Sequence, residues 1–313
     1  TSLPQTSSIQ PLSEAGPVKL ACATPGLLSS LHWVDDHDAN QPLQSDEVEI
    51  DTQAVGVNFR DVQIALGQDL EASFGHECAG VVAQAGELSG FYPGDRVLVF
   101  GPGRFKTRVR ARKHFVHRIQ DSLPLDHAAG VPATFGVMWH ILAEIGRLRS
   151  NQSILIHSAT GGMGQAAIQI AQYIGAEVYT TVSTREKKQC LVEEYGIAPD
   201  HIFYSRDPSF ARSVMKATNT RGVDVAICYS GGEIQQASWE CLSPYGSLIQ
   251  VGNSADAVAL RARPGRQASF VQFDSLRWMS DRPHDARESI DTVLSLMAEY
   301  RLRMQTPCSA KDA

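Results

Sequence analysis

The chain has 313 residues, which is enough for one large or two medium domains with a sizeable apolar core. Charged residues make up 20% and hydrophobic residues 43%, an ordinary balance for a globular protein. The formal net charge of -6 and the lack of a Lys/Arg run argue against nucleic acid or an anionic membrane as a partner. We also expect no apolar run long enough to cross a bilayer.

Six cysteines are scattered along the chain without a C-x-x-C pair: Cys22, Cys78, Cys190, Cys228, Cys241 and Cys308. This spacing favours reduced thiols over a disulfide framework or a structural zinc site. No N-terminal leader of charged and then apolar residues is visible. We therefore expect a cytoplasmic protein.

The first half of the chain indicates β structure. Residues 1–16 are rich in Ser, Pro and Gln and indicate a linker. Glu47–Asp51 alternates like a half-buried strand, and Gly80–Gly86 indicates another. A turn at Phe91–Arg96 precedes the apolar strand Val97–Phe100. Short strands divided by Gly and Pro predict a compact, barrel-like β domain.

The second half alternates between strands and helices. Strands are predicted near Ile154, Val178, Ile202, Val225 and Leu248. Helical windows begin near Met163, Glu186, Ser209 and Gly232, and an amphipathic helix covers residues 290–297. Repeated strand–helix units predict an α/β fold with a doubly wound parallel sheet.

A glycine turn follows the first of these strands. The buried run Ile154–Ile156 leads into the turn and then into an Ala/Gln/Ile-rich helix. Glycines let backbone amides approach a pyrophosphate, and the helix N-terminus adds partial positive charge. The order of strand, turn and helix predicts a dinucleotide site. The residues expected to hold the pyrophosphate are Thr160, Gly161, Gly162, Met163 and Gly164.

Several segments together resemble the medium-chain dehydrogenase/reductase family, in its quinone-oxidoreductase branch. The likeness is greatest to enoyl reductase domains of fungal, highly reducing, iterative type I polyketide synthases, and it runs from about Gly26 to Tyr300. Besides the glycine turn, the matching segments are Gly56–Val62, Gly75–Val82, Pro93–Val97, Arg221–Val225 and Ala237–Cys241.

The resemblance implies a two-domain organisation. A GroES-like β domain, which binds substrate, is expected over residues 17–134 and is expected to be rejoined by residues 262–313. A Rossmann domain that binds NADPH is expected over residues 135–261. A homodimer is also expected from the resemblance.

The family activity gives the expected chemistry. Such domains pass hydride from NADPH to the β-carbon of an α,β-unsaturated thioester carried on an acyl carrier protein. The resemblance therefore implies a polyketide synthase component whose partners are the tethered polyketide chain and the neighbouring synthase domains.

The second Rossmann strand favours NADPH over NADH. A site for NADH places Asp or Glu at the end of this strand to accept from the ribose hydroxyl. Here the run Val182–Lys188 offers a hydroxyl and then basic groups, which suit a phosphate dianion. By resemblance, Ser183, Lys187 and Tyr204 are expected to hold the adenosine phosphate.

A zinc site is not expected. His76 falls where zinc alcohol dehydrogenases have a ligand, but Asn58 replaces their first cysteine, and residues 132–134 contain no Cys or His. A catalytic zinc needs three protein ligands. We therefore interpret His76 as a buried structural residue and Cys78 as a small core residue.

The end of the cofactor site that reacts departs from the family pattern. Related domains carry Gly-Lys-(Arg/Thr)-Asp after the last Rossmann strand, and the Lys and Asp are the favoured proton donors. Gly252 retains the glycine, which we expect to contact the cofactor, but Asn253 and Ala255 replace the two donors. Losing a positioned acid costs on the order of 10²- to 10⁴-fold in rate.

Two further segments near this end also differ. The family's Asn-Ser-Leu-(Ser/Ala)-Gly is Cys228–Gly232 here, and Tyr229 could intrude where the nicotinamide should lie. The family's Thr-Ala-Tyr-Tyr is Val137–His140, which loses a hydroxyl expected to contact the carboxamide.

Three hypotheses remain open. The first is an enoyl reductase-like domain whose activity is weak or lost, with a separate enoyl reductase acting in trans. The second is an active NADPH-dependent enoyl reductase with another proton donor, for which Asn58, His76, His140 and Tyr229 are candidates. The third is a free-standing quinone oxidoreductase. We favour the first, because the departures gather at the reacting end.

Overall fold

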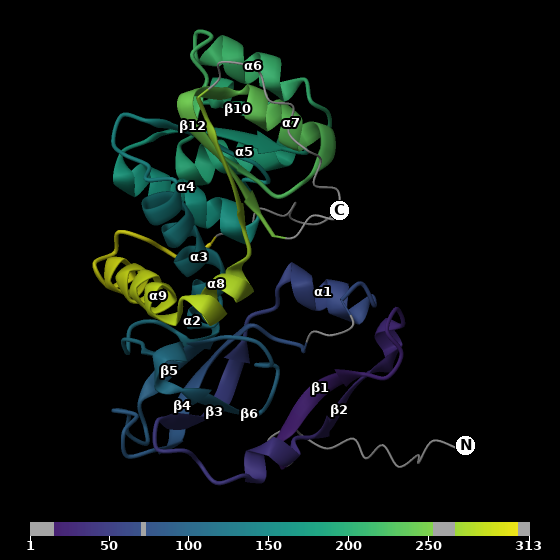
Figure 1. Cartoon of the computed structure of the whole chain (residues 1–313), viewed down its shortest axis with the longest axis vertical. Helices are drawn as coiled ribbons and strands as arrows, with labels where there is room; N and C mark the ends of the chain where they lie inside the picture. The colour runs from purple at the N-terminus through teal and green to yellow at the C-terminus, as the bar shows by residue number, and fades with distance from the viewer. Residues whose placement is uncertain (1–15, 70–72, 253–266, 306–313) are drawn as a thin grey trace. The chain divides into compact units, whose positions relative to one another are not determined.

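A computed structural model describes residues 16–69, 73–252 and 267–305 (Figure 1). The chain divides into two compact units, Thr1–Gly130 and Val131–Ala313. Nearly all of the predicted linker, residues 1–15, lies outside the described residues.

The first unit is antiparallel β structure. Its main sheet has the order β6-β3-β4-β5-β7, and a separate ribbon pairs β1 with β2. The strands are β1 (Val18–Cys22), β2 (Leu31–Asp35), β3 (Glu47–Val55), β4 (Glu77–Ala85), β5 (Arg96–Phe100), β6 (Arg108–Arg112) and β7 (Val116–Arg118). The unit also carries α1 (Phe59–Ala65) and α2 (Leu125–Ala128). The strands predicted at Glu47–Asp51, Gly80–Gly86 and Val97–Phe100 are confirmed as β3, β4 and β5.

The core of this unit comes from the buried alternate residues of its strands. Val48 and Ile50 of β3 pack with Val97 and Val99 of β5. Cys78 of β4 belongs to the same cluster, which confirms it as a small core residue. Burial raises the pKa of its thiol to about 12, so the group stays neutral.

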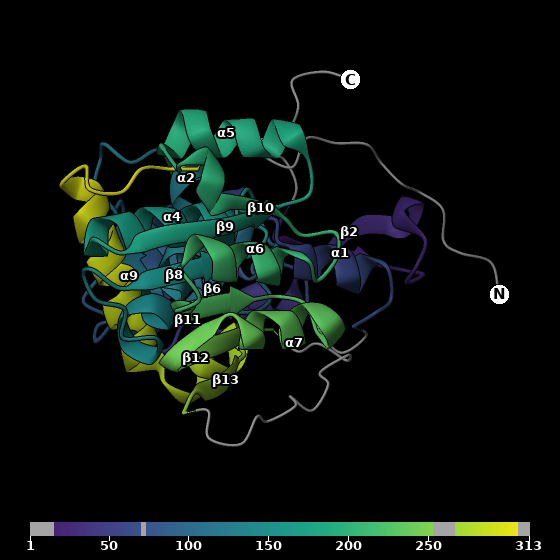
Figure 2. The same cartoon turned by 90° about the horizontal axis from the view of Figure 1, so that it is seen from above.

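The second unit is a doubly wound parallel sheet with the order β10-β9-β8-β11-β12-β13. Figure 2 shows β9, β8, β11, β12 and β13 side by side in that order. The strands are β8 (Ser153–Ile156), β9 (Glu177–Val182), β10 (Ile202–Tyr204), β11 (Val223–Cys228), β12 (Leu242–Val251) and β13 (Ser269–Phe273). The helices are α3 (Val137–Trp139), α4 (Gly162–Ile174), α5 (Arg185–Tyr195), α6 (Phe210–Ala217), α7 (Gly232–Glu240), α8 (Ser275–Asp281) and α9 (Pro283–Ala298).

Helices cover the sheet because its strands are apolar on both faces. Leu155 and Leu248 pack with Phe210 of α6 and Trp239 of α7 in one core cluster. Helix α4 contacts β8 and β9 and buries most of its own residues. The predicted alternation is confirmed, because each of the strands β8, β9, β10 and β11 is followed along the chain by a helix.

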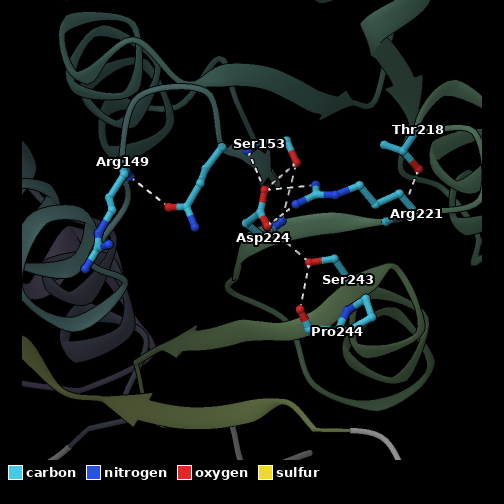
Figure 3. A network of polar contacts seen from close by, with 9 residues as sticks. Arg149, Ser153, Thr218, Arg221, Asp224, Ser243 and Pro244 are labelled. Atoms are coloured by element: carbon cyan, nitrogen blue, oxygen red, sulfur yellow. Dashed lines mark hydrogen bonds and ion pairs between the residues drawn. The ribbon is translucent and has the colours of Figure 1, made fainter.

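A polar network holds the strand starts together at the amino end of the sheet (Figure 3). The Asp224 carboxylate accepts hydrogen bonds from the Ser153 N–H (2.8 Å) and from the Ser243 hydroxyl (3.2 Å). Arg221 donates to both carboxylate oxygens, at 3.0 and 2.6 Å. Burial alone would raise the pKa of Asp224, but the bonds from Arg221 and Ser153 outweigh it, so the pKa is lowered. The network joins β8, β11 and β12.

A long helical stretch opens the second unit. Two π-helical segments, Pro132–Gly136 and His140–Ile145, flank α3. Gly136 leaves room for Ile290 of α9, because a Cβ at Gly136 would lie 2.7 Å from Ile290 Cγ1.

This stretch differs from our expectation about apolar runs. Within the described residues, Leu125–Ile145 has the length and apolar composition of a membrane-spanning helix. Its most apolar window is 56% buried inside the protein, and core helices of globular proteins pass the same test.

The domain boundaries expected from the resemblance stay a prediction. Strand β13 pairs in parallel with β12 and extends the second sheet, and the division into units falls between Gly130 and Val131. One expectation about the cysteines needs correction. The prediction of reduced thiols is wrong at Cys190, which is disulfide-bonded, although Cys22, Cys78, Cys228 and Cys241 are free. Spacing along the chain does not reveal such a bond.

Candidate dinucleotide-binding site

The strand order locates the site at the carboxyl edge of the second unit's sheet. The chain runs from β8 outward to β9 and β10, and then from β11 outward in the other direction. Ligands of such sheets bind across the crevice where the order reverses, here beyond β8 and β11. One side of the site is therefore formed by the ends of β9 and β10, and the other by the ends of β11 and β12.

The glycine turn leaves β8 at this position. Gly161 is the N-cap of α4, and its N–H donates to the Ser158 carbonyl at 2.9 Å. The first intrahelical acceptor serves Gln165, so the N–H groups of Gly162, Met163 and Gly164 have no helical carbonyl to bind. These donors and the helix dipole suit a pyrophosphate.

Gly164 allows α4 to lie against the strand end. A Cβ at Gly164 would lie 2.5 Å from the Ser158 carbonyl oxygen and 2.7 Å from Ala159 Cα. Both contacts are with backbone, so no side-chain rotation relieves them. Ser158 itself has a φ of 49°, a conformation that costs a non-glycine residue energy.

The side chain of Gln165 in α4 stabilises the turn. The Gln165 side chain donates to the Thr160 carbonyl at 2.8 Å. Its amide oxygen accepts a hydrogen bond from the Tyr195 hydroxyl of α5. The residues Thr160 to Gly164 are thus held by helices as well as by the strand.

The side formed by β9 and β10 gathers the expected phosphate-binding residues. Tyr204 ends β10, pairs with Val182 of β9 and is half exposed. Ser183 follows Val182, and Lys187 lies in the first turn of α5, where its N–H donates to the Thr184 hydroxyl at 3.3 Å. The structure thus brings Ser183, Lys187 and Tyr204 to one end of the sheet.

Arg206 is a residue that the sequence interpretation missed. Its Nε donates to the Ser183 carbonyl at 3.2 Å, so its guanidinium lies at the same strand end. Arg185 begins α5 beside it and is exposed. The sequence signal that could have revealed Arg206 is the presence of a basic residue two positions after Tyr204.

An aromatic residue follows β11 on the other side of the candidate site. Tyr229 follows β11, and its hydroxyl lies 3.9 Å from the Met138 sulfur of α3. Burial raises the pKa of the Tyr229 hydroxyl, so the group stays protonated. Gly252 directly follows β12 with a φ of 85°, and a Cβ there would meet no described atom within 4 Å.

His140 lies in an aromatic group. Its ring stacks on Trp278 of α8, with centroids 4.3 Å apart, and lies 5.7 Å from Phe273 of β13. Its Nδ1 is buried and has no hydrogen-bond partner within the part of the chain that the structure describes. Burial lowers the pKa of His140, so the ring is neutral at pH 7.

His157 directly follows β8 and lies in a buried hydrogen-bond network next to the candidate site. The Ser238 hydroxyl donates to the Ile234 carbonyl (2.7 Å) and therefore accepts from His157 Nε2 (2.8 Å). Nδ1 is then the acceptor for the Thr181 hydroxyl at 2.9 Å, which assigns the neutral tautomer. Burial lowers the pKa of His157 to about 4. The ring joins β8, β9 and α7, and the sequence interpretation did not single it out.

In the first unit, Asn58 and His76 belong to one polar cluster. The Asn58 amide donates to the Glu77 carboxylate at 3.0 Å, and its N–H donates to Asp61 at 2.8 Å as the N-cap of α1. Asp61 also accepts from the Gly75 N–H at 2.7 Å. His76 is buried and lies 3.9 Å from Asp61. Burial lowers its pKa, although Asp61 opposes the shift.

Two expected positions, Asn253 and Ala255, lie outside the described residues. A search of the described residues finds no group of three or more His, Cys, Asp or Glu side chains that could hold a metal ion. The structure therefore brings Ser183, Lys187 and Tyr204 to one end of the sheet and places Tyr229 directly after β11.

Comparisons with known proteins place the chain in a family. Residues 44–124 match the model of the alcohol dehydrogenase GroES-like domain, and residues 162–296 match that of the zinc-binding dehydrogenases. The highly reducing polyketide synthase tstA of Talaromyces stipitatus is 36% identical over 304 residues, which are 96% of this chain and 12% of that protein. The chain thus spans about an eighth of such relatives.

Solved structures agree with this result. The JamJ enoyl reductase in its apo form is 30% identical, with a TM-score of 0.83 over 93% of this chain and 90% of that one. A quinone oxidoreductase of Escherichia coli, solved with NADPH, shares the fold at 20% identity and a TM-score of 0.78, over 91% of this chain and 89% of that one. The chain therefore belongs to the medium-chain dehydrogenase/reductase family, as an enoyl reductase-like domain of the fungal reducing polyketide synthase type.

Proposed function

We propose that the second unit binds NADPH by its phosphate-bearing half and that enoyl reduction by this domain is weak or lost. The enoyl reductase-like family supplies the reaction, in which bound NADPH provides a hydride to an α,β-unsaturated thioester. The proposal concerns how this chain's residues hold the cofactor and whether they leave room for its reacting end.

The phosphate half is supported by the glycine turn and by the cationic end of β9. The N–H groups of Gly162 and Met163 suit the pyrophosphate, and Gly164 permits their approach. At the end of β9, Arg206 donates to the Ser183 carbonyl, and Lys187 lies in the first turn of α5. Charge-assisted hydrogen bonds from such groups favour a 2′-phosphate over a ribose hydroxyl. These residues fit NADPH.

The single observation that carries the loss of activity is the position of Tyr229. A dinucleotide that crosses from β9 over the glycine turn must place its reacting half beyond β11. Tyr229 directly follows β11, and its hydroxyl lies 3.9 Å from the Met138 sulfur. We infer that its phenol ring takes room that a planar nicotinamide needs.

The proton step supports the same conclusion. Reduction of an enoyl thioester leaves an enolate that must be protonated, and Asn253 and Ala255 replace the two donors that the resemblance implies. Nδ1 of His140 is buried, so it does not reach a substrate without movement of the aromatic group. We infer that no side chain among the described residues has taken over the acid role, and the loss of such an acid costs ~10²- to 10⁴-fold in rate.

The proposal also names partners. The substrate of the ancestral reaction is an enoyl chain on an acyl carrier protein, and a separate enoyl reductase acts in trans where reduction is required. The domain acts as a homodimer among neighbouring synthase domains in the cytoplasm. The relatives' description as highly reducing polyketide synthases supports the neighbouring synthase domains and the tethered substrate, whereas the partner in trans, the homodimer and the location are proposed from the family resemblance.

Two measurements on the unmodified chain test the proposal. NADPH titration by fluorescence should give saturable binding, and crotonyl-pantetheine with NADPH should turn over at least 10²-fold below an ordinary enzyme rate of about 10 s⁻¹. Turnover near that ordinary rate would contradict the loss of activity. Absence of NADPH binding would contradict the assignment of the phosphate half.

A further inference from the structure

The segment Arg301–Gln305 runs from the end of α9 back to the glycine turn. Leu302 is 3% exposed and anchors the start of this segment in the unit's core. The Arg303 N–H donates to the Gln169 side chain of α4 at 2.9 Å. We call Arg301–Gln305 the strap.

Arg303 ties the strap to α5 as well. Its guanidinium donates to the Glu194 carbonyl at 2.6 Å and lies 3.6 Å from the Glu194 carboxylate. The same guanidinium lies 5.8 Å from the centre of the Tyr195 ring. Because the Arg303 side chain is 59% exposed, the ion pair alone contributes little, and the hydrogen bond to the carbonyl carries more of the contact.

Gln305 reaches the glycine turn itself. Its side-chain amide donates to the Gly162 carbonyl at 3.1 Å. Gly162 is the first residue of α4, so this bond acts on a peptide of the turn that faces the pyrophosphate position. Gly162 is also limited by Thr134, because a Cβ there would lie 3.2 Å from Thr134 Cγ2.

The contacts form one connected set. Tyr195, beneath the Arg303 guanidinium, donates to Gln165, and Gln165 donates to the Thr160 carbonyl. The strap therefore acts on both ends of the turn, through Gln305 at Gly162 and through Tyr195 and Gln165 at Thr160.

We propose that Arg303 and Gln305 are positioning residues that hold the glycine turn in its phosphate-binding conformation. The inference rests on the proposed NADPH site and adds its regulation: cofactor affinity depends on whether the strap is docked. A glycine-rich turn has much backbone freedom to lose when it is ordered. A turn that is ordered before binding avoids that cost when the ligand arrives, which raises affinity.

Two strap variants are compared. Gln305→Ala removes one hydrogen bond, and the double variant combines Arg303→Ala with Gln305→Ala. Arg301→Ala is the matched control, since Arg301 is exposed, has the same chemistry and lies two positions before Arg303. The full chain is used throughout, and circular dichroism checks that each variant is folded. Gln305→Ala removes no buried apolar group, so it keeps the test open if the double variant unfolds.

Two readouts are measured. The first is the Kd for NADPH, which should rise about tenfold in the double variant and about threefold in Gln305→Ala, with Arg301→Ala unchanged. The second is amide hydrogen exchange of residues 160–164 without cofactor, which should accelerate in the strap variants by a similar factor. A purely structural role would leave exchange of the turn unchanged.

The outcomes separate the two proposals. If the unmodified chain binds NADPH and the strap variants keep its Kd and its exchange within twofold, the strap inference is wrong and the NADPH site stands. If the unmodified chain does not bind NADPH, the proposed site is wrong. Exchange of the turn in the variants then still decides whether the strap orders it.

Discussion

The two sides of the dinucleotide site differ in what their residues offer a ligand. The side formed by β9 and β10 has donors and cations: Ser183 follows β9, Lys187 lies in the first turn of α5, and Arg206 donates to the Ser183 carbonyl. The side formed by β11 instead has Tyr229, whose hydroxyl lies 3.9 Å from the Met138 sulfur. Within the described residues the strands of both sides are present, and the two sides differ in their side chains. We propose that phosphate binding persists in such a domain while the space for chemistry is filled.

The largest effect is expected from the turn that both sides share. Gly164→Ala would place a Cβ 2.5 Å from the Ser158 carbonyl oxygen, where only backbone movement relieves the clash. Overpacking of this kind costs ~1–3 kcal/mol and displaces the N–H donors of the turn. NADPH binding, measured by fluorescence titration, should weaken at least about 100-fold.

Gly16→Ala is the control, because a Cβ at Gly16 meets nothing within 4 Å. Unchanged NADPH affinity in Gly164→Ala would show that the turn does not hold the pyrophosphate, and would remove the basis for comparing the two sides.

The next prediction concerns removal of the Tyr229 ring at the end of β11. Tyr229→Ala combined with Asn253→Lys removes the ring and restores a donor type, so reduction of crotonyl-pantetheine should rise at least about tenfold above the unmodified chain. Asn253→Lys alone should change the rate by less than about twofold, because the ring still takes the space. Full recovery from Asn253→Lys alone would show that Tyr229 is harmless.

The third prediction concerns His157, which supports the carboxyl edge of the sheet. Its pKa of about 4 in the folded chain lies below the ordinary value of 6.5, so the unfolded chain binds more protons between these values. Stability is therefore lost as pH falls from about 6.5 toward 4, and does not fall further from this group below that range. Between pH 7 and pH 5 the loss should be about 2 kcal/mol.

Urea unfolding at the two pH values measures this loss. His157→Gln should lower stability at pH 7 and also flatten the pH dependence over this window. A slope that is the same in His157→Gln and in the unmodified chain would contradict the buried neutral assignment.

The smallest effect is expected from Lys187, at the proposed 2′-phosphate position. Lys187→Ala should raise the Kd for NADPH about five- to tenfold, because one partly exposed charge-assisted contact is lost, and should leave the Kd for NADH unchanged. Lys216→Ala in α6, an exposed lysine on another helix, is the control for net charge. Equal losses for NADPH and NADH would place Lys187 away from the 2′-phosphate.

The predictable part of this molecule is the part encoded by neighbouring residues. The glycine turn, its strand and α4 follow from a contiguous run, and apolar periodicity located the strands from β8 to β12. Strand β13 was missed as part of this sheet, because its membership depends on pairing with β12 across a segment of many residues. Sequence periodicity contains no information about such a partner.

The location of the candidate site was predictable to a similar extent. The resemblance named Ser183, Lys187 and Tyr204, and the structure brings them to one end of the sheet, where Ser183 follows β9, Lys187 lies in the first turn of α5 and Tyr204 ends β10. The His157 network could not be predicted, since Thr181 and Ser238 lie 24 and 81 positions away and meet the ring only in the folded sheet. The same holds for the strap, where Gln305 contacts Gly162 over 143 positions.

The most direct test of the account compares NADPH with 2′-phospho-ADP-ribose, a fragment that carries the 2′-phosphate and the pyrophosphate but lacks the nicotinamide. Isothermal titration with the unmodified chain and with Tyr229→Ala measures what the reacting half adds. The account predicts that NADPH binds the unmodified chain no more than about tenfold tighter than the fragment, and gains affinity in Tyr229→Ala. A preference for NADPH of about 1,000-fold in the unmodified chain, unchanged in Tyr229→Ala, would contradict it.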